Sequence, residues 1–254
     1  MGRFIFSDDI IDVTPSMVTV NQIDSDYPVE GMLDIWELYR HSRSANDNTW
    51  NIDIDFGATT SLQALFLDDL NINKIRLFED NGDGNWSQIA DYDITEDRRC
   101  FRYKAYIPLT FNNRRLRISF DSAVGTKTDD LSQWRIGRFV CFGTVKELAR
   151  NVSWGYTVTT SRPVKPIGRQ AISLGDKIET KFDLIFKERL KDHEDDLFFV
   201  GSLQSAAPVL LYENSDNPNK AYLCIKDGAG TQVTYINCTQ VTGGTVTLRE
   251  LVRV

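Results

Sequence analysis

Short stretches in which apolar and polar residues alternate run along most of this 254-residue chain. In Asn51–Phe56, Ile52 and Ile54 alternate with Asp53 and Asp55, so one face of the predicted strand is apolar and the other polar. Comparable patterns predict strands at Ile10–Val13, Met17–Val20, Ser61–Leu67, Lys74–Glu79, Ser87–Tyr92, Arg102–Leu109, Arg115–Phe120, Arg135–Phe142, Asn151–Thr160, Lys177–Phe186, Pro208–Tyr212, Lys220–Lys226, Val233–Cys238 and Val246–Val254. Many short strands with little helix indicate an all-β chain built from antiparallel sandwiches or jelly rolls.

Turns and two short helices are predicted between these strands. Gly57 is expected to end the first strand of the Trp50–Leu67 region. A helix is expected around Gly31–Tyr39, because Met32, Ile35, Trp36 and Tyr39 fall on one face. A second helix is expected at Glu188–Val200, with Leu190, His193, Leu197 and Val200 on one face and Gly201 as its C-terminal cap.

The charges are divided unevenly along the chain. Residues 1–150 hold 24 Asp and Glu against 17 Lys and Arg, whereas residues 151–254 hold 12 of each. This asymmetry indicates two separately built units, and Ser161–Pro166 reads as a connector rich in helix and strand breakers. We expect a jelly-roll domain at residues 1–149 and a smaller β-rich domain at residues 150–254, with its one helix at about residues 188–200.

The acidic first half argues against nucleic acid or an anionic membrane as the main partner, since both require a basic surface. Two arginine clusters, Arg98–Arg99 and Arg114–Arg117, are better explained as solvated strand faces than as phosphate sites. The N-terminus lacks the long apolar core of a signal peptide, and no apolar run has the length of a membrane span. We therefore expect synthesis and initial retention in a cytoplasm.

Metal and cofactor sites are not expected. The four cysteines, Cys100, Cys141, Cys224 and Cys238, have no CxxC spacing and are predicted to be buried thiols. The loop Glu79–Asn85 resembles a calcium loop superficially. Its twelfth position is Ala90 instead of Glu, however, so a hairpin turn is the better account.

No residue set predicts catalysis. His193 shares the apolar face of its predicted helix, and His41 has no clear acidic or thiol partner in the sequence. Acid pairs such as Asp53/Asp55 and Asp68/Asp69 are present, but a sequence does not show whether two carboxylates converge. We therefore expect a protein that is not an enzyme.

Aromatic residues are the remaining candidates for ligand contact, since their faces stack on sugar rings. Trp50 and Trp134 open predicted strands, so core packing is expected for them. Trp86, Trp36 and Tyr39 are the candidate glycan contacts, with Trp86 the one most expected to be exposed because it follows a glycine-rich turn.

The first half is similar to the discoidin-like, galactose-binding type of domain found in tailed-phage tail proteins. The resemblance lies in Y-P-V-E-G-M-L-D (Tyr27–Asp34), R-S (Arg43–Ser44), I-D-I-D-F-G (Ile52–Gly57) and W-R-I-G-R-F-V-C-F-G (Trp134–Gly143), and it covers about residues 1–148. It implies a jelly roll whose relatives often bind glycans through loops at one end. No copy of a sugar-binding triad is evident in this chain.

The second half resembles the tube-adjoining domain of siphophage distal or minor tail proteins. The matching features are F-D-L-I-F, L-F-F-V-G, P-V-L-L-Y-E and the final T-V-T-L-R-E-L-V-R-V. The resemblance implies a virion tail-tip protein assembled in the bacterial cytoplasm. It would form a ring of copies of itself, with a hexamer favoured over a trimer, that joins the tail tube to the hub and other tail-tip proteins. The last strand, Val246–Val254, is a sheet edge that a neighbouring copy could cover.

A carbohydrate-binding module that recognises host surface glycans is the alternative function, and a glycan-degrading enzyme is the least favoured.

Overall fold

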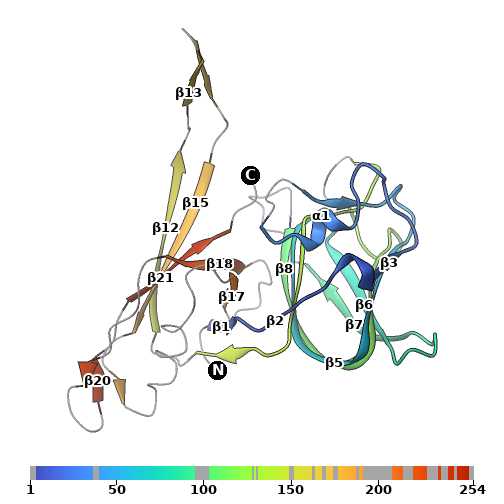
Figure 1. Cartoon of the computed structure of the whole chain (residues 1–254), viewed down its shortest axis with the longest axis horizontal. Coiled ribbons are helices and arrows are strands. Elements are labelled where there is room, and N and C mark those ends of the chain that lie inside the picture. The colour runs from blue at the N-terminus through green and yellow to red at the C-terminus, as the bar shows by residue number, and fades with distance from the viewer. Residues whose placement is uncertain are drawn as a thin grey trace. The chain divides into compact units, whose positions relative to one another are not determined.

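The computed structural model describes residues 4–36, 40–94, 103–127, 129, 131–148, 152–161, 164–167, 170–173, 177–186, 189–190, 208–213, 220–227, 234–235, 240–242 and 245–251. These residues are almost entirely β-structure in antiparallel sheets, which confirms the predicted all-β class (Figure 1). The chain forms two compact units. The sandwich unit comprises Asp9–Lys146 with Ser215–Ala221, and the terminal unit comprises Met1–Asp8, Glu147–Asn214 and Tyr222–Val254.

The sandwich unit contains one large sheet and one two-stranded sheet. Its elements are β2 (Ile10–Ile11), η1 (Pro15–Met17), β3 (Val18–Val20), α1 (Glu30–Leu33), β4 (Ser42–Arg43), β5 (Trp50–Leu70), β6 (Lys74–Asp80), β7 (Ser87–Asp93), β8 (Tyr103–Phe120), β9 (Arg135–Ile136) and β10 (Arg138–Phe142). The large sheet has the order β2-β10-β5-β8-β6-β7, and β3 also pairs with β5. The small sheet pairs β4 with β9.

The two central strands, β5 and β8, are long and curved, as Figure 1 shows. We expected Gly57 to end a strand, but β5 continues through it. Instead, the register with β8 shifts between Asp55 and Thr60, where Gly57 has φ +76°. A side chain at that φ would be strained, so glycine permits a bend at this point. The prediction was wrong because a glycine bulge and a strand-ending turn carry the same sequence signal.

This bend lets the two halves of the sheet pack face to face around one core. The first half of β5 pairs with β3, and its second half pairs with β10. Ile52 and Ile54 from the first half share one buried cluster with Leu65 and Leu67 from the second. Trp50 and Trp134 are fully buried in the same cluster, as predicted.

Two arginine–aspartate pairs tie the end of β5 to the β9–β10 segment. Arg138 Nε donates to Asp68 Oδ2 at 3.0 Å, and Arg135 Nε donates to Asp69 Oδ2 at 2.9 Å. Arg138 is 2% exposed, so its charge requires this carboxylate. Asp69 adopts a positive φ of 58°, a conformation that aspartate tolerates better than most residues, beside a register shift between Leu67 and Leu70.

The terminal unit contains a second large sheet and two small ones. Its strands are β1 (Phe4–Ser7), β12 (Val152–Ser161), β13 (Val164–Ile167), β14 (Gln170–Ser173), β15 (Lys177–Phe186), β16 (Arg189–Leu190), β17 (Pro208–Glu213), β18 (Ala221–Asp227), β19 (Thr234–Tyr235), β20 (Gln240–Thr242) and β21 (Thr245–Glu250). Together with β11 (Lys146–Glu147), the large sheet has the order β11-β1-β17-β18-β21-β15-β12. Its core includes Phe6, Phe182, Leu184, Leu211 and Leu248.

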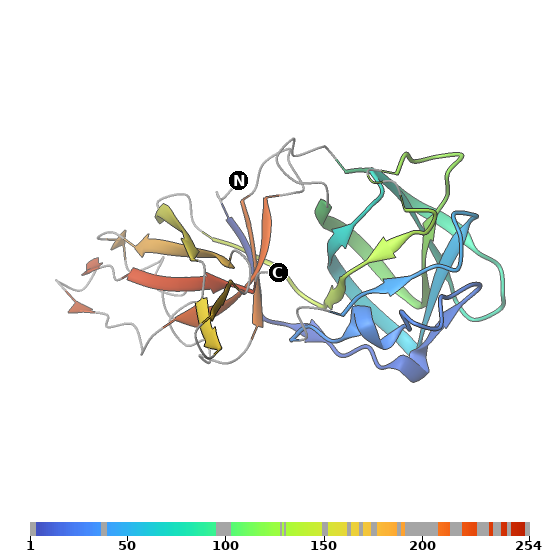
Figure 2. The ribbon, with the colours of Figure 1, turned by 90° about the horizontal axis from the view of Figure 1, so that it is seen from above.

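The N-terminal strand belongs to this second sheet. We placed residues 1–149 in one domain, but β1 pairs with β17, with Phe4 opposite Glu213 and Ser7 opposite Leu210. Figure 2 shows this blue strand among the orange and red strands of the C-terminal half. Phe4 and Phe6 are buried there. Sequence alternation predicts that a strand is half-buried but does not identify its partner.

The expected edge strand is another correction. We expected Val246–Val254 to be a sheet edge, but β21 lies between β18 and β15, and residues 252–254 are outside the described residues. The edge next to β15 is β12, which pairs with it from Val152 opposite Phe186 to Ser161 opposite Lys177.

Both predicted helices differ from the structure. α1 ends at Leu33, and Asp34 is extended, with φ −81° and ψ 99°. The Asp34 carboxylate accepts a hydrogen bond from the amide of Trp36 at 3.0 Å, a local bond that competes with helix continuation. In the predicted helix Glu188–Val200, Arg189–Leu190 instead form β16, paired with Gln240–Val241, because ladder hydrogen bonds replace helical ones there. Residues 188 and 191–200, with His193, lie outside the described residues.

The predicted connector is also replaced by regular structure. Val164–Ile167 pairs with Gln170–Ser173 as a two-stranded hairpin. Pro166 stands opposite Ala171 in that hairpin, where every strand is an edge and a proline is tolerated.

The buried Asp68–Arg138 pair yields a stability prediction. Asp68→Ala should lower the free energy of unfolding by about 3–5 kcal/mol, because it leaves the Arg138 guanidinium buried without a carboxylate. Urea unfolding followed by circular dichroism measures this loss. The double variant Asp68→Leu with Arg138→Met should recover most of it. Asp47, which is 51% exposed and paired with Lys127, is the matched control, and Asp47→Ala should lower the free energy of unfolding far less than Asp68→Ala does. Equal losses for Asp68→Ala and Asp47→Ala would contradict the prediction.

Candidate functional site

A loop between Asp24 and Arg43 forms the first candidate site of the sandwich unit. Its two ends are held together by backbone hydrogen bonds from Asp24 N to Arg43 O at 3.0 Å and from Arg43 N to Tyr27 O at 3.2 Å. The buried Ser42 hydroxyl bonds Pro28 O at 2.6 Å and accepts from Met32 N at 3.1 Å. The loop is therefore fixed by bonds that do not involve its exposed side chains.

Gly31 allows α1 to approach the returning chain closely. A Cβ atom at this position would lie 2.5 Å from the carbonyl oxygen of His41, so any other residue would displace the backbone there. The close approach places His41 beside Tyr27, with ring centroids 4.7 Å apart and the rings stacked.

Three side chains of this loop hold one another. The Arg43 guanidinium lies 4.0 Å from the centroid of the Tyr27 ring. Arg43 Nε also donates to His41 Nε2 at 2.8 Å, so that nitrogen must be unprotonated. We predicted no role for His41 because its sequence neighbours include no acid or thiol. Its partners are an aromatic ring and an arginine that the fold brings together.

A pocket of about 430 Å³, here called the charged pocket, opens beside these rings. It is lined by Asp26, Tyr27, Pro28, Glu30, Gly31, Arg40 and His41. Asp26, Glu30 and Arg40 are exposed, and their side chains have no polar partner in the described part of the chain. The pocket therefore presents two carboxylates and one guanidinium next to a rigid aromatic pair. Tyr39, one of our three candidate residues, lies outside the described residues.

The carboxylate beneath this loop is held ionised. The amide of Asp26 donates to Asp24 Oδ1 at 3.0 Å and lowers the pKa of Asp24. Gln133 Nε2, 2.6 Å from Asp24 Oδ2, lowers this pKa further.

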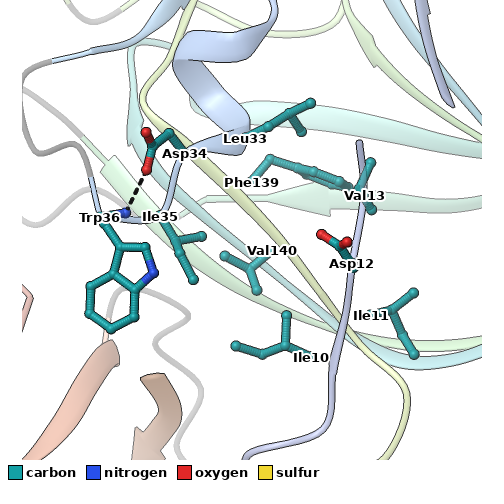
Figure 3. Close-up of a pocket in the computed structure, with 10 residues that line it drawn as sticks. All are labelled: Ile10, Ile11, Asp12, Val13, Leu33, Asp34, Ile35, Trp36, Phe139 and Val140. Carbon is teal, nitrogen blue, oxygen red and sulfur yellow. Dashed lines mark hydrogen bonds between the residues drawn. The ribbon is translucent and has the colours of Figure 1, made fainter. Parts of the chain in front are cut away.

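Trp36 lies in a second pocket, of about 360 Å³, whose lining residues are mostly apolar (Figure 3). The pocket is lined by Ile10, Ile11, Asp12, Val13, Leu33, Asp34, Ile35, Trp36, Phe139 and Val140. The Trp36 side chain is 51% exposed.

Trp86, the third candidate, is less available than predicted. It is half-buried, and the Arg117 guanidinium lies over its ring at 4.0 Å from the centroid. It lines neither of the two pockets, so the structure does not bring it together with Trp36.

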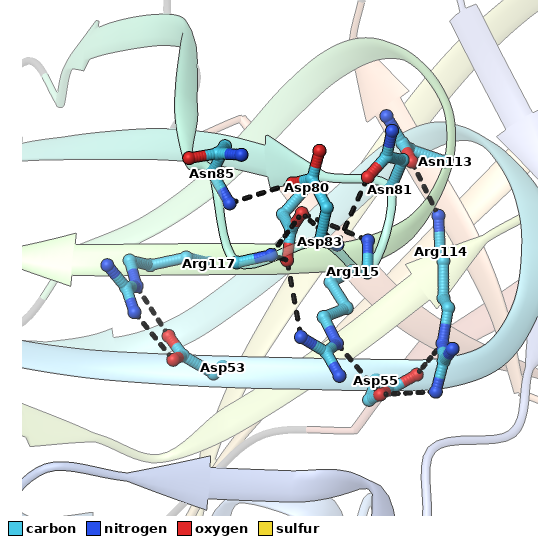
Figure 4. A network of polar contacts seen from close by, with 12 residues as sticks. Asp53, Asp55, Asp80, Asn81, Asp83, Asn85, Asn113, Arg114, Arg115 and Arg117 are labelled. Atoms are coloured by element: carbon cyan, nitrogen blue, oxygen red, sulfur yellow. Dashed lines mark hydrogen bonds and ion pairs between the residues drawn. The ribbon is translucent and has the colours of Figure 1, made fainter.

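The acid pairs considered for catalysis are occupied by arginines (Figure 4). Arg117 binds Asp53 with two hydrogen bonds of 2.6 and 2.7 Å. Arg114 binds Asp55 in the same bidentate way, at 2.8 and 3.0 Å, and Arg115 adds a third bond to Asp55 at 2.8 Å. These bonds, with that from Arg114 the strongest influence, hold the pKa of Asp55 well below its usual range. The arginine cluster is thus a neutralised strand face, as expected.

The loop Glu79–Asn85 is the predicted hairpin. Glu79 of β6 pairs with Ser87 of β7, and the buried Asp80 accepts the amides of Gly82 at 2.9 Å and Asp83 at 3.1 Å. Burial acts to raise the pKa of Asp80, but these amide bonds and the bond from Arg115 bring it below its ordinary value. The carboxylate at the centre of the loop therefore serves the turn.

Other candidate chemistry is limited in the described part of the chain. No group of three or more His, Cys, Asp or Glu residues there is arranged to hold a metal ion, and no described helix is long and apolar enough to span a membrane. Cys141 and Cys224 are buried free thiols, and burial raises the pKa of Cys141 above its usual range. Cys100, Cys238 and Arg98–Arg99 lie outside the described residues.

Comparisons with known proteins show likeness at the level of chain folding. No protein-family model matches this chain, and no curated protein matches it in sequence. Among solved structures, it is similar to a CBM32 of AlyQ in complex with 4,5-unsaturated mannuronic acid, at 15% identity and a TM-score of 0.40 over 53% of this chain and 98% of that one. CBM32-3 from a family 31 glycoside hydrolase of Clostridium perfringens is similar at 13% identity and a TM-score of 0.38, over 53% and 95% of the two chains. Reduced XRCC1 bound to DNA pol beta catalytic domain is similar at 8% identity and a TM-score of 0.40, over 54% and 97%. These proteins have different partners, and a likeness of this degree assigns none of them to this chain.

The pKa of Asp55 yields a prediction about acid stability. Its folded-state pKa lies below the unfolded value of about 3.9, so its stabilising contribution is full above that pH and is lost as the pH falls through the folded-state pKa. Asp55→Asn should cost about 1–3 kcal/mol at pH 7, a range that allows for the 32% exposure of Asp55. The difference from the unsubstituted protein should shrink as the pH falls from 5 to 2, as measured by urea unfolding. Asp93→Asn is the control, since Asp93 is 80% exposed and paired only with Lys74. A pH-independent cost of Asp55→Asn would contradict the prediction.

Proposed function

We propose that the sandwich unit is a carbohydrate-binding module and that its ligand binds in the charged pocket formed by the Asp24–Arg43 loop. The observation that carries this proposal is the set of unpartnered, exposed charges of Asp26, Glu30 and Arg40 around that pocket. Sugar hydroxyls both donate and accept hydrogen bonds, so a site with carboxylate acceptors and a guanidinium donor suits them.

The rigidity of the pocket supports the same function. The ring stack of Tyr27 on His41 and the bond from Arg43 to His41 fix the wall before any ligand arrives. A preformed wall lowers the entropic cost of binding a small polar ligand. The bonds that close the loop, from Ser42 and Asp24, do not involve the three exposed charges, which therefore remain available.

The test is a glycan array followed by calorimetry with the full chain. We expect at least one glycan to be retained, and Asp26→Asn, Glu30→Gln and Arg40→Gln each to weaken its binding by about 10- to 100-fold, the usual value of a hydrogen bond to a charged group. Trp36→Ala, in the other pocket, is the control and should change the affinity less than about twofold. The proposal would be refuted if the array retained no glycan. It would also be refuted if Trp36→Ala abolished glycan binding while the three charge substitutions left it unchanged.

A second proposal concerns assembly, and β12 supports it. We infer a structural role for the chain at a phage tail tip, in a ring of copies with a hexamer favoured, that links the tail tube to the hub and other tail-tip proteins. β12 is a ten-residue edge strand without a charged residue, and Gly155, Thr157 and Val158 are exposed on it, Val158 by 51%. Edge strands that remain unpaired are usually protected by charge, proline or bulges. An uncharged edge therefore favours pairing with another chain, and in a ring that chain is a second copy.

Mass photometry and light scattering over a concentration series test this assembly. The full chain should form a closed oligomer at micromolar concentration, and Val158→Lys should shift it to monomer by placing a charge on the edge. Thr245→Lys is the matched control, because Thr245 is exposed on the interior strand β21. A monomer at tens of micromolar, or dissociation by both substitutions, would rule out assembly through β12.

A further inference from the structure

The pocket that contains Trp36 lies where β2 separates from β10. β2 pairs with β10 only at two positions, Cys141 opposite Ile11 and Phe142 opposite Ile10. β10 continues from Val140 back to Arg138 and stays paired with β5 on its other side over this stretch. In register, Asp12 would stand opposite Val140, but the chain leaves the ladder after Ile11. A wedge therefore opens between β10 and residues 12–13.

Most of the side chains that line this wedge are apolar. Eight of the ten lining residues are apolar. Seven of them are isoleucine, valine, leucine or phenylalanine, and the eighth is Trp36. In Figure 3, Ile35 and Trp36 lie on one side of the pocket and Ile10 to Val13 on the other. The Trp36 side chain is 51% exposed at the mouth of this pocket. Tryptophan is one of the residue types most often found at the energetic centre of protein interfaces.

Both charged residues that line the wedge are acidic. Its two polar lining residues are Asp12 and Asp34, and no basic residue lines it. Asp34 accepts the amide of Trp36, whereas Asp12 is exposed and has no partner in the described part of the chain. A ligand that complements the wedge must therefore be apolar where it enters and positively charged beside Asp12.

We propose that this wedge is a docking site for an extended, basic segment of a partner polypeptide. An apolar side chain of the segment fills the pocket against Ile35, Phe139 and Trp36, and a neighbouring lysine or arginine pairs with Asp12.

The chemistry of the wedge separates this ligand from the glycan proposed for the charged pocket. A sugar needs hydrogen-bond partners around its whole rim, and the side chains that line the wedge offer polar groups only at Asp12 and Asp34. A polypeptide brings apolar and cationic side chains close together on one strand, because residues i and i+2 share a face. The two sites therefore take different ligands, and this inference does not depend on glycan binding.

Fluorescence anisotropy with a labelled synthetic peptide, acetyl-KSISKS-amide, tests the proposal on the full chain, because its isoleucine and its two lysines share one face of an extended strand. We expect saturable binding that Trp36→Ala weakens at least tenfold. Asp12→Asn should weaken it about three- to tenfold, and raising the salt concentration should remove most of the difference between that variant and the unsubstituted protein. Trp86→Ala is the matched aromatic control and should leave the affinity within about twofold.

Three further arms make the outcome decisive. The acidic peptide acetyl-ESISES-amide and the polar peptide acetyl-KSSSKS-amide should each bind at least tenfold more weakly than acetyl-KSISKS-amide. A chitosan hexamer, which offers positive charge without apolar side chains, should not compete with the peptide. Asp12→Lys, at an exposed position, should reverse the preference between the basic and acidic peptides. Displacement of the peptide by the chitosan hexamer, equal binding of all three peptides, or unchanged binding by Trp36→Ala would overturn the proposal.

Discussion

The sandwich unit depends on arginine–carboxylate pairs that cross between neighbouring strands. Asp53 and Asp55 on β5 meet Arg117 and Arg115 of β8 directly across the ladder, and Asp68 meets Arg138 of β10 in the same way. A slip of one residue would separate every such pair and turn the apolar face of β5 outward. Two independent requirements, charge pairing and burial, therefore select the same register, and the long bent strands keep it through the bulge at Gly57.

The candidate loop is held by this framework at its far end. Ser44 and Trp134 exchange bonds, from Ser44 N to Trp134 O at 3.0 Å and from Trp134 N to Ser44 Oγ at 2.7 Å. Next to them, Arg43 of β4 pairs with Arg135 of β9, whose side chain binds Asp69 at the end of β5. The loop that carries Tyr27 and His41 thus begins and ends on residues fixed by the core, which explains how exposed side chains keep a definite geometry.

The sequence contained enough to predict the strands and the two core tryptophans, because alternation and burial follow directly from side-chain chemistry. Arg43–Ser44 and Trp134–Gly137, two of the segments that carry the family resemblance, also meet in space, a contact that the sequence did not predict. Pairing partners were not predictable, since alternation is the same whichever strand lies alongside. For this reason the predicted domain boundary separates β1 from its sheet, and the predicted edge strand β21 is an interior strand. Asp53, a candidate for catalysis, is bound by Arg117, which the sequence does not show.

For the candidate residues, too, the sequence identified the residue types but not the contacts that decide their exposure. Exposure of Trp36 follows from the short α1, which ends because the Asp34 carboxylate bonds the amide of Trp36. The Arg117 guanidinium lies over the Trp86 ring. The two residues are thirty-one positions apart in the sequence, so no local sequence pattern predicts this contact. The same loop places charged residues at one pocket and apolar residues at another, because Gly31 draws its first part against His41 while the chain after Leu33 turns toward β10. One loop can therefore offer two ligands of different chemistry without either site requiring the other.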